Sequence, residues 1–210
     1  MRLWSRQTFV PLGVVFALSV FPVVMFAIAS MIANPGPAFA AERGVTKNGA
    51  TTVAYYVEFH ARGGSPVGHT FMIAGRILDS GRRVREHHFG FSGEAGGIQS
   101  VVGTPGTIGP QPLDLKLPTL VQFNVRLRYY QYRQLERVLR RARTRVPTYR
   151  LLTVNCNTFA GYIARSVGLR ASADTVVLPI DYVVRLARLN SRLGQLSARG
   201  KGRGHLPARV

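Results

Sequence analysis

The sequence predicts an α+β domain in which a small antiparallel sheet has helices packed on one face. Segments rich in β-branched and aromatic residues come first, between residues 51 and 92, and segments with helical spacing of apolar residues follow after residue 130. Separate runs of strands and helices are typical of the α+β class. With 210 residues, of which 46% are hydrophobic, the chain can build one core and has little room for a second domain.

A β-hairpin is predicted near the start of the domain. Residues 51–61 and 67–78 have the composition of strands, and 83–92 reads as the strand that returns after a tight turn at 79–82. If the turn is centred between Ser80 and Gly81, the numbers of paired residues add up to about 161.

The next segment, residues 93–118, is dense in Gly and Pro and predicts a long loop, which could hold a short strand at Gln99–Val102. Residues 120–127 alternate between apolar and polar side chains and predict one more strand.

Three helices are predicted in the second half. An amphipathic helix spans residues 130–145, with arginines on its polar face. Asn155 is a good N-cap for a helix that begins at Cys156 and ends near Gly168. Pro179 suits the first turn of a last helix, and the Gly-rich basic segment 197–210 predicts a disordered tail.

The first 40 residues have the layout of a secretory signal. Two arginines precede a long apolar run, and Ala38-Phe39-Ala40 provides small residues where a signal peptidase cleaves. Cleavage would leave a mature chain that starts at Ala41, with a folded domain over 41–196, in the periplasm or outside the cell. The alternative is an uncleaved anchor in the inner membrane, because the apolar run is long enough to span a bilayer.

The chain is strongly basic, with 28 Lys+Arg against 9 Asp+Glu. Nine arginines lie between residues 126 and 150, where Glu136 is the only acid. Such a surface attracts anionic partners, which for an exported protein are phospholipid head groups, lipopolysaccharide or acidic cell-wall polymers. Export, and the lack of a recognisable DNA- or RNA-binding motif, argue against nucleic acid as the partner. The alternative is a solvated arginine-rich surface without a specific partner.

The single cysteine, Cys156, is the main candidate for chemistry. It excludes an internal disulfide and a zinc site with two or four cysteines. A thiol in the first turn of a helix is favoured as thiolate, which is the form a nucleophile needs. Among the five histidines, His69 is the best candidate for the base, because it begins a strand directly after a glycine-rich loop. The alternative is an inert buried cysteine.

Two residues are candidates for the group that orients His69. The hairpin register places Ser92 opposite His69, and it places His88 four residues short of that position. A bulge would shift the register, so His88 stays a second candidate. Glu58 with His60, and Glu86 with His88, could each share a strand face and ligate a metal ion, but no metal or cofactor is expected from this pattern.

These residues carry a resemblance to a known superfamily. Gly68-His69-Thr70-Phe71 at the head of a strand, followed by Asn155-Cys156-Asn157-Thr158-Phe159 at the start of a helix, resembles the circularly permuted papain-like proteins. That group includes the lecithin retinol acyltransferase type and is related to the NlpC-type cell-wall peptidases. The resemblance covers about residues 53–189, and it implies that Cys156 is the nucleophile and His69 the general base.

The function expected from the sequence is therefore an exported thiol hydrolase or acyltransferase that needs no cofactor. The resemblance suggests an amide or ester bond in a cell-wall peptide or a lipid acyl group as the substrate. The alternative is a protein of the same fold without catalytic activity, which binds anionic polymers or lipids of the envelope. The sequence predicts no particular oligomeric state.

Overall fold

A computed structural model describes residues 50–64 and 67–198. Their architecture is α+β, as predicted, with a six-stranded antiparallel sheet in the order β4-β3-β2-β1-β5-β6. The strands are β1 (Thr52–Arg62), β2 (His69–Leu78), β3 (Arg83–Gly93), β4 (Gly106–Gly109), β5 (Thr119–Leu127) and β6 (Gly194–Ala198).

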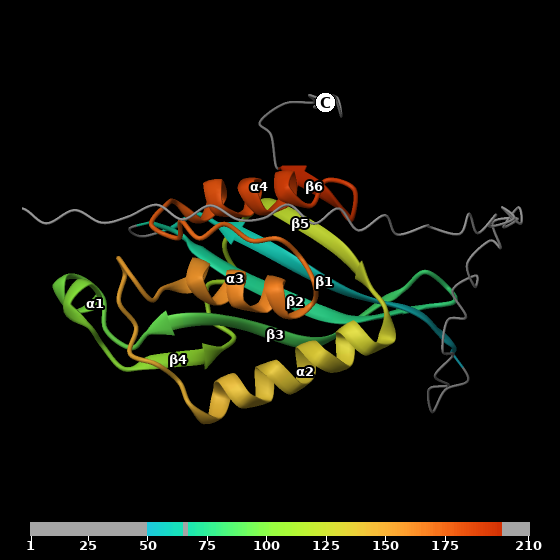
Figure 1. Cartoon of the computed structure of the whole chain (residues 1–210), viewed down its shortest axis with the longest axis horizontal. Coiled ribbons are helices and arrows are strands. Elements are labelled where there is room, and N and C mark those ends of the chain that lie inside the picture. Colours follow the sequence, from blue (N-terminus) through green and yellow to red (C-terminus); the bar gives the residue numbers. More distant parts are fainter. Residues whose placement is uncertain (1–49, 65–66, 199–210) are drawn as a thin grey trace, which may run out of the picture. The chain divides into compact units, whose positions relative to one another are not determined.

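The described helices are α1 (Ile98–Val102), α2 (Tyr129–Thr144), α3 (Cys156–Ser166) and α4 (Pro179–Leu189). Figure 1 shows α2, α3 and α4 along one face of the sheet, with α1 projecting at one end. The main core lies between this face and the three long helices, and its strand residues include Phe59, Met72, Phe89 and Phe123. The prediction that helices cover one face is confirmed for the described residues.

The predicted hairpin register is confirmed over the middle of β2 and β3. Phe71 pairs with Gly90 and Ala74 pairs with His87, so both pairs add up to 161. The register then shifts by one residue, because Gly75 pairs with Arg85 and Glu86 is the extra residue of a β-bulge.

The helix starts follow from local capping. The side chain of Asn155 accepts a hydrogen bond from the backbone N–H of Thr158 at 3.0 Å, which satisfies one of the free donors of the first turn of α3. Pro179 occupies the first turn of α4, where its missing N–H costs nothing.

Two predictions about the loop were wrong. The segment predicted as a short strand at Gln99–Val102 is the helix α1, whose hydrogen bonds close within the segment, as from Gly103 N–H to the carbonyl of Gln99 at 2.8 Å. A strand was missed at Gly106–Gly109, where β4 pairs with the edge of β3. Whether such a segment becomes a strand depends on whether the edge of a neighbouring strand is available for pairing. Local composition does not encode this.

The C-terminal segment differs from the prediction at its beginning. Ser197 and Ala198 belong to β6, which pairs with the otherwise open edge of β5. The rest of the predicted tail and the predicted signal segment, residues 1–40, lie outside the described residues. None of the helices in the described part is long and apolar enough to cross a membrane.

The second face of the sheet carries a smaller cluster of apolar residues around Phe71 and Ile73. At the end of the sheet where β1 finishes and β2 begins, the segment between β4 and β5 supplies Asp114, which is fully buried. This end of the sheet holds the candidate site.

Candidate functional site

Cys156 is the first residue of α3, and its side chain is close to the head of β2. The residue is 5% exposed. Hydrogen bonds from the backbone of Thr70 and Asn157 lower the pKa of the Cys156 thiol, but its burial raises that pKa more, so the net effect is an increase. The hydrogen bonds at the helix start thus favour the thiolate, as expected, but burial outweighs them.

Thr70 and Asn157 join β2 to α3 beside the thiol. The Thr70 hydroxyl donates to Oδ1 of Asn157 at 2.6 Å. The Asn157 amide then donates to the carbonyls of Thr175 and Val177 at 3.1 and 2.8 Å. Since all donors and acceptors of the Asn157 side chain are used in this way, the start of α3 is held against both β2 and the loop before α4.

His69 begins β2 and is 7% exposed. Its ring lies parallel to that of Phe71, with centroids 6.4 Å apart. A Cβ atom on Gly90 would lie 2.5 Å from Nε2 of His69, so only glycine leaves room for the imidazole at that position of β3. Nε2 itself is buried without a hydrogen bond, and the nearest carboxylate oxygen, Oδ1 of Asp114, lies 4.0 Å away.

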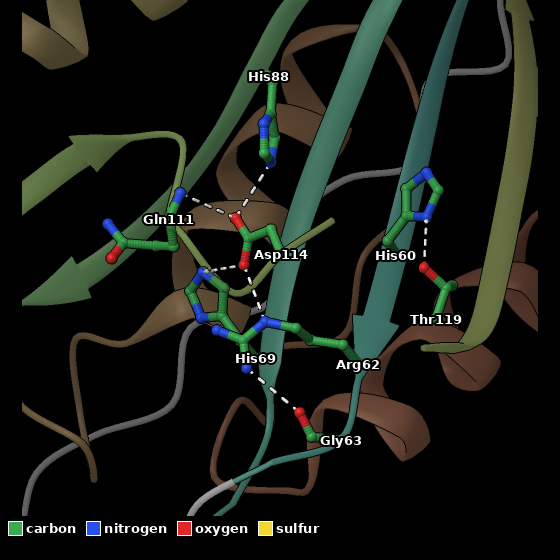
Figure 2. Close-up of polar contacts among 8 residues, drawn as sticks. All are labelled: His60, Arg62, Gly63, His69, His88, Gln111, Asp114 and Thr119. Carbon is green, nitrogen blue, oxygen red and sulfur yellow. Dashed lines mark hydrogen bonds and ion pairs between the residues drawn. The ribbon is translucent and has the colours of Figure 1, made fainter. Parts of the chain in front are cut away.

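Asp114 lies in the loop between β4 and β5, and its carboxylate is close to side chains of β1, β2 and β3 (Figure 2). It accepts a hydrogen bond from Nε of Arg62 at 2.9 Å, contacts Nε2 of His88 at 3.1 Å and accepts from the backbone N–H of Gln111 at 3.1 Å. A fully buried carboxylate is stable only when its oxygens are satisfied in this way. Asp114 was not predicted as a site residue, although it is the only acid between Glu94 and Glu136 in the sequence.

The imidazole of His69 is neutral at physiological pH. The pKa of His69 is lowered from 6.5 to about 4, mainly by burial and to a smaller extent by the guanidinium of Arg62 and the ring of His88. The Asp114 carboxylate acts in the opposite direction without overcoming burial. A neutral imidazole has a lone pair that can accept a proton, but the lowered pKa makes His69 a weaker base than a free histidine.

The low pKa of His69 predicts a loss of stability in acid. Because the unfolded chain binds a proton near pH 6.5 and the folded chain only near pH 4, stability is complete above pH 6.5 and falls as the pH drops towards 4. We expect His69 to account for a decrease of roughly 3 kcal/mol in the free energy of unfolding over this range. Urea unfolding at several pH values measures it, and the His69→Gln variant should show a flatter pH dependence. Equal slopes for the two proteins would contradict the assignment.

The structure brings Cys156 and His69 to the same end of β2 but does not join them by a hydrogen bond. Thr70 faces α3 and contacts the thiol, whereas His69, the preceding residue, turns to the opposite face because side chains alternate along a strand. The His69 ring therefore points away from α3. The two residues are neighbours through the backbone of Thr70.

The two candidates for an orienting group have different positions. Ser92 lies on β3 opposite Thr107 of β4, and no hydrogen bond joins it to His69 within the described part of the chain. His88 lies opposite Ile73, as the register predicts, yet it meets His69 through the shared carboxylate of Asp114. The sequence could not show this link, because a loop residue provides it.

The residues considered as metal ligands bind each other or other side chains. Nε2 of His60 lies 3.0 Å from Glu58, and its Nδ1 lies 3.4 Å from the hydroxyl of Thr119 (Figure 2). Glu86 and His88 do not share a face, because the bulge turns Glu86 towards the helices, where it accepts from Tyr132. Within the described ranges, no group of three or more His, Cys, Asp or Glu side chains is arranged to hold a metal ion.

The predicted basic surface lies on α2 and the segment after it. Within residues 50–64 and 67–198, six exposed arginines of this region take part in no ion pair: Arg137, Arg140, Arg141, Arg143, Arg145 and Arg150. Glu136, the acid in this helix, already binds Arg133 at 2.6 Å. The arginines therefore remain available for an anionic partner.

Comparison with known proteins identifies no relative: no protein-family model matches the chain, and neither the curated proteins nor the solved structures contain a match.

Proposed function

We propose that the protein is a thiol hydrolase or acyltransferase of the circularly permuted papain-like type, with Cys156 as nucleophile and His69 as general base. One observation carries the proposal: the thiol at the start of α3 contacts Thr70, and the next residue towards the N-terminus is a buried neutral histidine with a carboxylate beside it. A cysteine, a histidine and an aspartate in this order are the parts of an activated nucleophile.

The proposed reaction proceeds through a thioester. Sγ of Cys156 attacks the carbonyl carbon of an amide or ester, and the thiol proton passes to His69. His69 returns this proton to the leaving amine or alcohol as the C–N or C–O bond breaks, which leaves the acyl group on Cys156. Water, or an acceptor alcohol or amine, then attacks the thioester carbonyl and gives a proton to His69. The C–S bond breaks, the acid, ester or amide leaves, and His69 returns the proton to Sγ, which restores the thiol. The backbone N–H of Cys156 is the natural donor to the oxyanion.

The resting state in this proposal is a neutral thiol beside a neutral imidazole, because burial raises the pKa of Cys156 and lowers that of His69. Because the ring and the sulfur lie on opposite faces of the sheet, proton transfer requires the head of β2 to rearrange when the substrate binds, so that the imidazole reaches the sulfur. In the resting state Asp114 lies beside the imidazole, with its Oδ1 4.0 Å from Nε2, where its charge favours the protonated ring.

The proposed substrates are cell-wall peptides or lipid acyl groups, and the proposed location is the periplasm, the exterior of the cell or the membrane surface. The catalytic groups are side chains of the chain itself, so the reaction as written uses no cofactor.

Trapping of the acyl intermediate tests the proposal. We expect p-nitrophenyl acetate to acetylate Cys156, and mass spectrometry of an acid-quenched digest should find the acetyl group on the peptide that contains it. The Cys156→Ala variant should release no burst of p-nitrophenolate. Acetylation that is absent, or that is the same in both proteins, would contradict a nucleophilic role.

A second candidate function is binding of anionic envelope surfaces without catalysis. The observation that favours it is the row of exposed arginines from Arg140 to Arg150, which has no acidic partner within the described residues. Such a surface concentrates the protein at polyanions in a salt-dependent manner. The binding assay in the next subsection tests this candidate with lipid and with polymer.

A further inference from the structure

The helix α1 exposes apolar side chains that have no partner in the described part of the domain. Ile98 is 79%, Val102 is 72% and Val101 is 41% exposed, and α1 buries none of its residues. The helix projects from the domain (Figure 1), and added Cβ atoms on Gly96 and Gly97, directly before it, would meet no atom within 4 Å. A group of exposed apolar residues, unlike a single one, marks an interaction site.

More exposed apolar residues surround the start of α3. Leu152 is 51% exposed and lies in the turn that leads to Cys156, next to Leu151, whose N–H donates to the carbonyl of Ser100 in α1 at 2.7 Å. Val176 and Leu178 are 57% and 53% exposed and flank the Asn157 side of α3. We call the six residues the apolar rim: Ile98, Val101, Val102, Leu152, Val176 and Leu178.

The strand register places the apolar rim at the end of the sheet that holds the candidate site. Arg62 pairs with both His69 and Thr119, so β1 ends there while β2 and β5 begin. The antiparallel β3 also ends there, shortly before α1. Figure 1 shows α1 and the start of α3 at this same end.

The arginines of α2 reach the same end. β5 finishes at the far end of the sheet, so α2 starts there and its 16 residues run back over about 24 Å. The segment after α2 then runs beside the segment after α1, because Tyr149 and Thr104 form a bridge and Gly103 lies against Arg150. Arg143, Arg145 and Arg150 are all exposed in this region.

We propose that this end of the domain docks on an anionic phospholipid bilayer, with the apolar rim in the interface and the arginines on the lipid phosphates. Apolar side chains next to exposed cations match the two layers of a membrane surface, whereas a soluble polyanion matches only the cations. The predicted export signal places the chain beside a membrane. This inference about the substrate rests on the proposed function: docking would present lipid acyl esters, rather than cell-wall peptides, to Cys156.

A tryptophan reporter tests the insertion. Trp4 is the only tryptophan of the chain, so a protein that starts at Ala41 has none, and Ile98→Trp introduces a single tryptophan. We expect its emission to shift to shorter wavelength with vesicles of phosphatidylcholine and phosphatidylglycerol. The matched control is Leu193→Trp, because Leu193 is 56% exposed but precedes Gly194, which pairs with Val125 near the far end of β5. The control should not shift.

Sedimentation with the same vesicles separates the contribution of the apolar rim to binding from that of the arginines. We expect Val102→Ser to weaken binding about tenfold and Leu193→Ser to leave it unchanged. Arg143→Gln and Arg145→Gln should each weaken it about fivefold at low salt. Binding to a soluble acidic polysaccharide should depend on the arginines but not on Val102.

Equal emission shifts at positions 98 and 193, or binding that Val102→Ser does not change, would overturn the proposal and leave a polyanion surface only. These measurements need no thiol chemistry, so docking can fail while Cys156 is acylated normally. Conversely, vesicle binding in a protein whose Cys156 takes no acyl group would overturn the proposed function alone.

Discussion

Replacement of Asp114 by Asn is expected to destabilise the fold by about 3–5 kcal/mol, because it removes one partner of a buried ion pair. Asp114 is fully buried and binds Arg62, whose exposure is only 8%. Without the carboxylate, the guanidinium stays buried with an uncompensated charge, and His88 and the backbone of Gln111 lose an acceptor. The loop between β4 and β5 would then detach from the sheet.

Urea unfolding monitored by circular dichroism measures this loss. Glu94→Gln is the matched control, since Glu94 is exposed and forms no ion pair in the described ranges, and its effect should stay within about 0.5 kcal/mol. If Asp114→Asn costs no more than the control, the buried ion pair does not stabilise this end of the sheet.

The sequence predicted best those features that are set by local chemistry. The alternation of residues 51–61, the Asn155 cap and the first-turn Pro179 each specify their element without reference to the rest of the fold. The predicted hairpin register is found only beyond the bulge at Glu86, because the pairs next to the turn, such as Ile77 with Arg83, differ from it by one residue.

The features that were missed depend on distant partners. β4 and β6 form on open edges of β3 and β5, and nothing within their own few residues requires a strand. Asp114 is similar, because its importance comes from Arg62 and His88 on other segments. The sequence feature that could have identified Asp114 is that it is a single acid within a Gly- and Pro-rich segment.

The candidate site was predicted in part. Cys156 begins α3 and His69 begins β2, as the motifs indicated, and both lie beside Thr70. The direction of the His69 ring could not be predicted, because the first residue of a strand after glycines can face either side, and here burial beside Phe71 and Asp114 decides it.

Replacement of His69 by Gln is expected to slow the acylation of Cys156 by a factor of about 10²–10⁴, the usual contribution of a general base. Glutamine keeps much of the volume of the imidazole and can hydrogen-bond, but it cannot accept the thiol proton. The matched control is His87→Gln, because His87 lies on the helix face next to Glu136, whereas its neighbour His88 contacts Asp114 on the other face.

The rate of the p-nitrophenolate burst from p-nitrophenyl acetate tests the pairing of Cys156 with His69 most directly. The pairing predicts a fast burst in the unmodified chain and in His87→Gln, and a loss of at least a hundredfold in folded His69→Gln. Bursts of equal rate in all three proteins would show that His69 takes no proton from the thiol and would contradict the proposed mechanism.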